Sequence, residues 1–319
     1  MAGLTMPSTA SAPSIAIRTF EQLRESARAL GPKRVGVVVA DDDVALLAAS
    51  AAAKLRLAVP VLIGTESKIR NKIRALGIEE LVANAEFLSA TDSASAATLA
   101  TTLARDGGID ILLKGHLRTD ELLRAVLDKQ AGLRTGRLLS DVMLYEDSLA
   151  GYRRLIGVSD GGLNVAPDLE QKKQILLNAF DVMRAIGIER PKMAIMSATE
   201  AVTPSVPSTM DAQTLTEMAK LGAFGDCDVY GPLALDNALL ESAAREKGIT
   251  SPVAGHADCM IVPNIEAGNL LGKAVKYLGG SQCAHVVLGA KIPVLIPSRV
   301  ESVDDKVNSV ALGVLAHGR

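Results

Sequence analysis

Four short segments carry the residue types best suited to bind an anionic substrate. Residues 114–119, 159–162, 262–269 and 297–299 each follow an apolar run and combine turn-forming or polar residues, most often glycine, with charged side chains. Lysine and arginine match phosphate oxygens, and glycine allows close backbone approach. Turn formation alone would explain the glycine and asparagine in any one of them. Their recurrence favours a binding site.

The familiar nucleotide and metal motifs are missing from the sequence. No G-x-x-x-x-G-K-[ST] run occurs, and no G-x-G-x-x-G follows a predicted strand. The four histidines lack the i, i+4 spacing of a zinc-binding helix; they are His116, His256, His285 and His317. We expect each histidine to be structural or solvent-facing, and we expect no metal site.

Alternating elements would position these loops. Apolar runs over 34–40, 59–64, 85–90 and 109–115 alternate with helical patterns over 20–30, 41–57, 65–77, 93–106 and 119–128. This alternation predicts βαβ units and a buried parallel sheet. Ligands bind such sheets at the carboxyl ends of the strands, which is where the four loops fall.

The alternation breaks around residues 129–147. Two strands are predicted over 138–145 and 152–158 without a helix between them, so we expect antiparallel pairing or a bridge between two domains. A domain boundary is therefore expected near residue 152. Beyond it the alternation resumes, with helices predicted over 169–187, 212–221, 237–248, 270–278 and 302–316, and strands over 192–198, 227–230, 259–262, 285–289 and 293–297.

Composition narrows the class of protein. The chain has 319 residues, a formal net charge of -2, 3% aromatic residues and no tryptophan, which argues against nucleic acid as a partner. No apolar run is long enough to span a bilayer, and residues 1–15 are expected to form a disordered tail and not a signal peptide. Three scattered cysteines predict reduced thiols and a cytoplasmic protein.

Several motifs in order resemble one enzyme family. Gly255-His256-Ala257-Asp258, then residues 263–269 with Lys273, and the closing run 297–305 are similar to the signature stretches of phosphate acetyltransferases and phosphate butyryltransferases. The segments around Lys114 and Arg124, the run 132–136, and the stretch 231–237 are similar as well. The likeness extends from about residue 35 to residue 315.

This resemblance implies a fold, a reaction and an assembly. The implied fold is α/β, with two doubly wound domains and an interdomain cleft, as in the isocitrate and isopropylmalate dehydrogenases. Domain I would comprise 16–151 and 291–319, and domain II 152–290. The implied reaction is reversible: acyl-CoA and phosphate give acyl phosphate and CoA. Coenzyme A would be a substrate, no cofactor would be tightly bound, and the protein would be a homodimer.

The same resemblance implies roles for individual residues. Ser298 would hydrogen-bond the CoA thiol, Arg299 would hold the acyl phosphate, and Asp305 would be the base. Arg124 would be a second substrate-binding arginine. The family's substrate-binding positions also fall on the residues Lys114, Thr119, Asn264, Glu266 and Asn269.

Asp305 has two competing interpretations. Complete transfer of a thiol proton to an aspartate of ordinary pKa is unfavourable by about 6 kcal/mol. Burial would therefore have to raise the pKa of Asp305, or a neighbouring cation would have to stabilise the thiolate. Alternatively, Ser302 and Asp305 form an S-x-x-D capping box that opens the last helix.

Two cysteines are weaker candidates for a catalytic nucleophile. Cys259 is expected in the buried core. Cys283 lies two residues before His285 on the same strand face, but we expect it to be a structural thiol.

Other functions stay open at the level of sequence. Val300 replaces the glycine that acetyltransferases carry after the Ser-Arg pair, and other segments look closer to butyryltransferases, so acyl length is open. A metal- and NAD-dependent dehydrogenase would share the two-lobed architecture and would need an aspartate cluster, for which Asp226, Asp228 and Asp236 are the candidates. A homologue that binds acyl-CoA without turnover is the third possibility.

Overall fold

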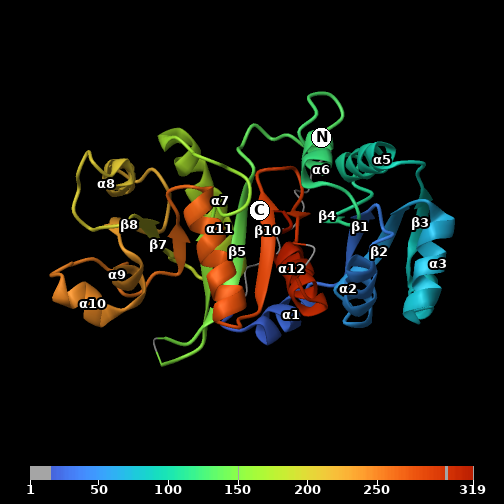
Figure 1. Ribbon diagram of the computed structural model, residues 1–319, viewed down its shortest axis with the longest axis horizontal. Helices are drawn as coiled ribbons and strands as arrows, with labels where there is room; N and C mark the ends of the chain where they lie inside the picture. Colours follow the sequence, from blue (N-terminus) through green and yellow to red (C-terminus); the bar gives the residue numbers. More distant parts are fainter. Residues whose placement is uncertain (1–15, 150, 299–300, 319) are drawn as a thin grey trace, which may run out of the picture.

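One continuous sheet forms the framework of the protein. The computed structural model describes residues 16–149, 151–298 and 301–318. Within these residues an 11-stranded sheet has the order β3-β2-β1-β4-β11-β10-β5-β6-β9-β7-β8 (Figure 1). The strands are β1 (Lys33–Val38), β2 (Ala58–Gly64), β3 (Glu86–Ser89), β4 (Ile111–Lys114), β5 (Ser140–Asp147), β6 (Arg154–Ser159), β7 (Lys192–Met196), β8 (Asp228–Leu233), β9 (Cys259–Ile261), β10 (Cys283–Leu288) and β11 (Val294–Leu295).

The strand pairing confirms the predicted α/β class. Most neighbours are parallel, as βαβ units require. The exceptions lie at the centre, where β10 is antiparallel to both β11 and β5, and β5 is antiparallel to β6. The antiparallel pairing predicted for the strands on either side of residue 150 is therefore confirmed. Strand β5 precedes the expected domain boundary in the sequence, but in the sheet it lies between β6 and β10, which both come after that boundary. The domain boundaries themselves stay a prediction.

Helices cover both faces of the sheet. The buried side chains of α1, α2, α3, α4, α7, α8 and α12 belong to one apolar cluster on one face. Those of α5 and α6 form a second group on the other face, and those of α9 and α10 form a third, against which the partly buried Ala267 and Leu271 of α11 pack. The helices are α1 (Phe20–Ala29), α2 (Asp43–Lys54), α3 (Glu66–Leu76), α4 (Glu80–Asn84), α5 (Ser93–Arg105), α6 (Thr119–Val126), α7 (Leu169–Ala185), α8 (Pro207–Lys220), α9 (Leu235–Leu239), α10 (Glu241–Glu246), α11 (Ile265–Lys273), a π-helical turn η1 (Ala274–Leu278) and α12 (Val303–Ala316).

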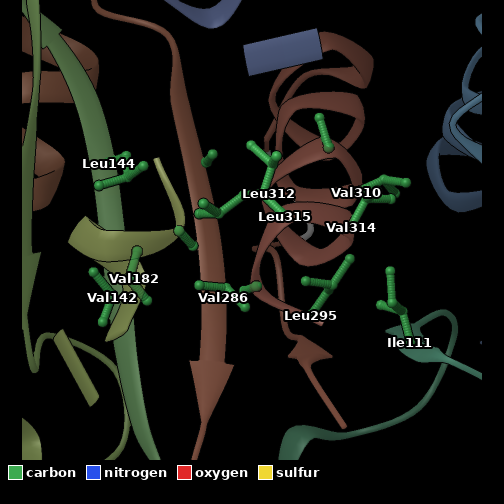
Figure 2. Packing of buried hydrophobic residues seen from close by; sticks show 14 of the residues in the cluster. Ile111, Val142, Leu144, Val182, Val286, Leu295, Val310, Leu312, Val314 and Leu315 are labelled. Carbon is green, nitrogen blue, oxygen red and sulfur yellow. The ribbon is translucent and has the colours of Figure 1, made fainter. Parts of the chain in front are cut away.

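Alternation along the central strands decides what each face carries. On β10, Val286 and its even-numbered neighbours face the cluster that includes α12, and on β5 Val142 and Leu144 do the same (Figure 2). The odd-numbered residues of β5 and β10 therefore point to the opposite face. That face is left partly open, because α6 belongs to one apolar group and α11 to another.

The last helix joins distant parts of the chain. Helix α12 packs on β10 and also contacts α1 and α2 (Figure 1). Most of its residues are buried, and Figure 2 shows Leu312 and Leu315 on the side of the helix that faces β10. Burial of this kind supplies most of a helix's stability.

Three predicted helices differ from the observed ones, and the short helix α4 was not predicted. The helix expected over 212–221 begins earlier, at Pro207. The helix expected over 237–248 is split at Leu240, whose φ of -118° and ψ of 114° are extended. The helix expected over 270–278 begins earlier, at Ile265, because Asn264 caps it, and its last turn is π-helical. Residues 1–15, expected to form a tail, lie outside the described residues.

Two simpler expectations can be compared with the described part of the chain. The three cysteines are free and buried, as expected for reduced thiols. None of the helices in the described ranges is both long enough and apolar enough to cross a bilayer.

Candidate functional site

A cavity of about 540 Å³ opens over the central strands, between α6 and α11. All four polar segments singled out in the sequence contribute to its lining, through residues that include Lys114, Gly161, Asn269 and Ser298. The prediction that these loops meet at one edge of the sheet is confirmed. The volume is in the range of small-molecule sites.

Strands β5 and β10 form the floor of the cavity. Asp141 and Met143 of β5 and Cys283, His285 and Val287 of β10 line it, and all are odd-numbered. Met143 lies directly across from His285 in the antiparallel register, and Asp141 lies across from Val287. Asp141 and His285 are thus diagonal neighbours on one face, close enough for their side chains to meet.

The loop after β6 approaches α11 so closely that glycine is needed at the two contacting positions, Gly161 in the loop and Gly268 in the helix. A Cβ atom on Gly161 would lie 2.8 Å from the carbonyl carbon of Gly268, and one on Gly268 would lie 2.7 Å from Cα of Gly161. Side chains at either position would push the loop and the helix apart. Asn269 adds a hydrogen bond from Nδ2 to the Gly161 carbonyl oxygen at 3.2 Å.

Asp160 organises the same loop from inside. Its carboxylate accepts hydrogen bonds from the backbone N–H groups of Gly162 at 2.7 Å and Leu163 at 3.0 Å, and from Nδ2 of Asn164 at 2.5 Å. Burial raises the pKa of Asp160, the neighbouring charge of Asp141 raises it further, and the hydrogen bonds oppose both effects. The side chain is only 2% exposed, so its role is to hold the loop.

Both ring nitrogens of His285 lie near carboxylate oxygens. Its Nδ1 lies 3.0 Å from Oδ2 of Asp141, and its Nε2 lies 3.8 Å from Oε1 of Glu301. Its backbone N–H donates to Oγ of Ser309 at 2.9 Å. Burial lowers the pKa of His285, but the charge and hydrogen bond of Asp141 outweigh it and raise the pKa well above the usual value. Because a carboxylate only accepts, Nδ1 carries the proton directed at Asp141.

Cys283, His285 and Glu301 form a compact group that could also hold a metal ion. Their donor atoms lie within 4.8 Å of one another. Only deprotonated thiol and carboxyl groups bind metals, and burial raises the pKa of both Cys283 and Glu301. Oε1 of Glu301 already accepts the backbone N–H of Ser298 at 2.8 Å. These features suit proton exchange better than metal binding.

Asp305 does not line the cavity. Its side chain is fully buried and hydrogen-bonds the N–H of Cys283 at 2.9 Å and the hydroxyl of Ser302 at 2.6 Å, and it forms an ion pair with Lys276. Burial would raise the pKa of Asp305, but the hydrogen bonds of Lys276 and Ser302 hold it below the usual value. The capping box is present. This geometry favours the capping role, and the role of base stays a prediction.

The structure brings together some predicted site residues and not others. Ser298, Lys114, Thr119 and Asn269 line the cavity. Arg124, Asn264 and Glu266 are not among its lining residues: the Arg124 side chain is 78% exposed and 3.7 Å from Asp120, Asn264 caps α11, and Glu266 is exposed. Arg299 lies outside the described residues, as does Val300.

Cationic and apolar side chains share the cavity wall. Lys114, Arg118, Lys273 and Lys276 supply positive charge. The Lys114 ammonium also donates to the carbonyl oxygens of Gly115 and Leu117, at 3.4 Å and 3.3 Å. Apolar contacts come from the residues Met143, Val158, Leu163, Val287 and Ile296. The cavity can therefore accept an anion beside a small apolar group.

The aspartates considered for a dehydrogenase lie elsewhere. Asp226 and Asp228 each form an ion pair with Arg190, at 2.8 Å. Neither they nor Asp236 line the cavity. They do not form the metal-binding cluster that this alternative needs.

Sequence reasoning missed four polar residues of this region. Asp141 sits inside an apolar run and gave no local signal, and Glu301 and Lys276 lie in segments whose contacts depend on the fold. Asp160 stands in a predicted loop but had no assigned role. His285 was expected to be structural or solvent-facing; its spacing from Cys283 was the only sequence signal.

Comparison with known proteins identifies relatives along almost the whole chain. The model described as "Phosphate acetyl/butaryl transferase" matches residues 89–314. A phosphate acetyltransferase from Rhizobium meliloti is 39% identical over 300 residues, which cover 94% of each chain. A phosphate butyryltransferase from Clostridium acetobutylicum is 37% identical and covers 95% of this chain and 99% of the relative.

A solved structure agrees with these sequence matches. A branched-chain phosphotransacylase from Enterococcus faecalis V583 superimposes with a TM-score of 0.77. It is 26% identical and covers 90% of this chain and 99% of its own. The likeness therefore extends over most of the chain.

Proposed function

The chain belongs to the phosphate acetyl/butyryl transferase family, and from this premise we propose that it transfers a short acyl group reversibly between coenzyme A and inorganic phosphate in the cavity over β5 and β10. It is an acyltransferase. The observation that carries the location is the convergence of all four polar loops on one cavity.

The lining suits the two halves of this reaction. Phosphate and the phosphate groups of CoA are anions, and four cationic side chains surround the cavity. The acyl group is small and apolar, and Met143 and Val287 offer it an apolar floor. In acyl phosphate formation a phosphate oxygen attacks the thioester carbonyl carbon, and the carbon–sulfur bond then breaks. Donors fixed near the carbonyl oxygen would stabilise the charge that develops there.

The positions of the described residues support roles for several of them. Ser298 would hydrogen-bond the thiol; its position in the cavity lining, with its N–H donated to Glu301, supports this role. Lys114, Thr119 and Asn269 would contact phosphate or the CoA chain, since they line the same cavity. Arg299, adjacent to Ser298 in sequence, would hold the acyl phosphate. Arg124, Asn264 and Glu266 would act farther out, on the distal part of CoA.

Two parts of the proposal rest on the family resemblance alone. One is a homodimeric assembly, and the other is the absence of a tightly bound cofactor. Gel filtration with light scattering tests the first, and the absorption spectrum and metal content of the purified protein test the second.

Release of free CoA tests the proposed function. Purified protein is incubated with acetyl-, propionyl- or butyryl-CoA, with and without phosphate, and the free thiol is followed. Phosphate-dependent release is expected, and the rates rank the acyl groups. Absence of release with every acyl-CoA would contradict the enzyme assignment. Release that does not depend on phosphate would indicate a hydrolase instead.

A further inference from the structure

The reaction requires a group that exchanges the proton of the CoA thiol. A thiolate is the nucleophile in one direction and the leaving group in the other. Asp305 is poorly suited to this exchange, because its carboxylate is fully buried and already bound by Lys276, Ser302 and the N–H of Cys283. The cavity must offer another group.

His285 meets the geometric requirements. It lines the cavity together with Ser298, and its side chain is 19% exposed. Asp141 engages Nδ1 at 3.0 Å, which leaves Nε2 as the nitrogen that can exchange a proton with a ligand. A carboxylate behind an imidazole fixes its orientation and stabilises the protonated ring.

Acidic side chains lie beside both ring nitrogens of His285. Asp141 on β5 and Glu301 in the turn before α12 are both nearly buried, and Cys283 lies on the same face of β10. Lys114 and Lys276 line the same cavity, and Lys276 is already paired with Asp305. The two carboxylates therefore stabilise an imidazolium, and Glu301 lies beside the nitrogen that would hold the exchangeable proton.

We propose that His285 is a catalytic residue that exchanges the proton of the CoA thiol, and that Asp141 is its positioning residue. In acyl phosphate formation, the carbon–sulfur electron pair leaves with sulfur, and His285 Nε2 donates its proton to that sulfur. In the reverse direction, neutral His285 accepts the thiol proton, the thiolate attacks the acyl phosphate carbonyl, and phosphate leaves with the carbon–oxygen electron pair. This inference rests on the proposed function.

The test compares pH profiles in the direction of acyl phosphate formation. His285→Asn keeps an amide donor for Asp141 but removes Nε2. We expect about a 10²-fold loss of kcat at neutral pH, typical of a lost general acid. His256→Asn is the matched control, because His256 does not line the cavity, and it should behave as wild type at every pH.

The ratio of wild-type to variant rates separates catalysis from structure. It is measured from about pH 6 to about pH 10, which brackets the ordinary pKa values of imidazole and thiol. A group that acts as an acid loses its proton above its pKa, so the ratio should be constant at low pH and fall at high pH. The raised pKa of His285 places this fall above the usual histidine range. Ionisation of phosphate is common to both proteins and cancels.

Asp141→Asn supplies an independent readout. Removing its charge removes the main factor that raises the pKa of His285, so the alkaline fall of the remaining activity should move to lower pH. This variant decides the question even if His285→Asn does not fold. If the activity of Asp141→Asn falls at the same alkaline pH as that of the wild type, the role of Asp141 is contradicted.

Three results would overturn the inference. The first is wild-type turnover by His285→Asn, and the second is a loss that does not vary with pH. The third is loss of wild-type activity on chelation with recovery on adding Zn²⁺, because Cys283, His285 and Glu301 would then be metal ligands. A wild-type protein that releases no CoA would instead refute the proposed function itself.

Discussion

Oδ1 of Asp305 accepts the backbone N–H of Cys283 at 2.9 Å, which ties the first turn of α12 to the start of β10. The other carboxylate oxygen binds Ser302 and pairs with Lys276 of the π-helical turn. One buried side chain therefore joins three segments that surround the cavity. Its contacts hold the start of α12 against β10 and the π-helical turn.

Asp305→Asn is predicted to destabilise the protein more than it impairs the chemistry. The change removes the partner of Lys276, and breaking a mostly buried pair costs about 3 kcal/mol. Urea unfolding measures this loss, and turnover is measured where the variant is still folded. Asp304→Asn is the matched control, because Asp304 lies in the same helical turn with a side chain that is 67% exposed. A stable variant with at least a 10²-fold loss of kcat would instead support Asp305 as the base.

The stability that Asp305→Asn loses should depend on pH. The pKa of Asp305 is lowered by folding, so its stabilisation is complete above the ordinary value of 3.8 and is lost as pH falls through the lower folded-state value. The difference in unfolding free energy between wild type and Asp305→Asn should thus be constant near neutral pH and narrow below about pH 4. A difference that widens on acidification would contradict this sign.

Arg299→Ala is predicted to lose about 10² to 10³-fold in kcat, which is typical for removal of one donor that stabilises transition-state charge. Arg124→Ala is the comparison: its side chain is exposed on α6, so we expect KM for CoA to rise while kcat changes little. Steady-state kinetics with thermal unfolding distinguishes the two. Wild-type turnover by Arg299→Ala would show that the site is misplaced.

Asn269→Ala and Glu266→Ala test which part of α11 faces the substrate. Asn269 lines the cavity and holds the Gly161 carbonyl, whereas Glu266 is exposed and does not line it. We expect the Asn269 change to raise KM for acyl-CoA about tenfold, comparable to the loss of a hydrogen bond, and the Glu266 change to have a smaller effect. An equal effect of both changes would contradict the placement of the cavity.

Much of the fold could be predicted from the sequence because its signals are local. The apolar runs and helical periodicity gave the α/β class, and the missing helix near residue 150 gave the antiparallel pairing of β5 and β6. The four loops could be placed at one edge because carboxyl ends of parallel strands meet there. The extended residue Leu240 and the π-helical turn had no comparable signal.

The interior of the site could not be predicted in the same way. Asp141 and His285 are 144 positions apart, and they meet only because β10 pairs antiparallel with β5 in one register. A shift of that register by one residue would turn His285 to the other face. The burial of Asp305 likewise depends on α12 packing against β10. Such contacts follow from long-range pairing, which local patterns do not encode.

A crystal structure of the protein with bound CoA tests the central claim most directly. We expect the thiol sulfur to lie inside the cavity over β5 and β10, within hydrogen-bond reach of the Ser298 hydroxyl and near His285 Nε2. Acyl transfer at this site requires that placement. A CoA molecule bound with its sulfur outside this cavity would contradict it.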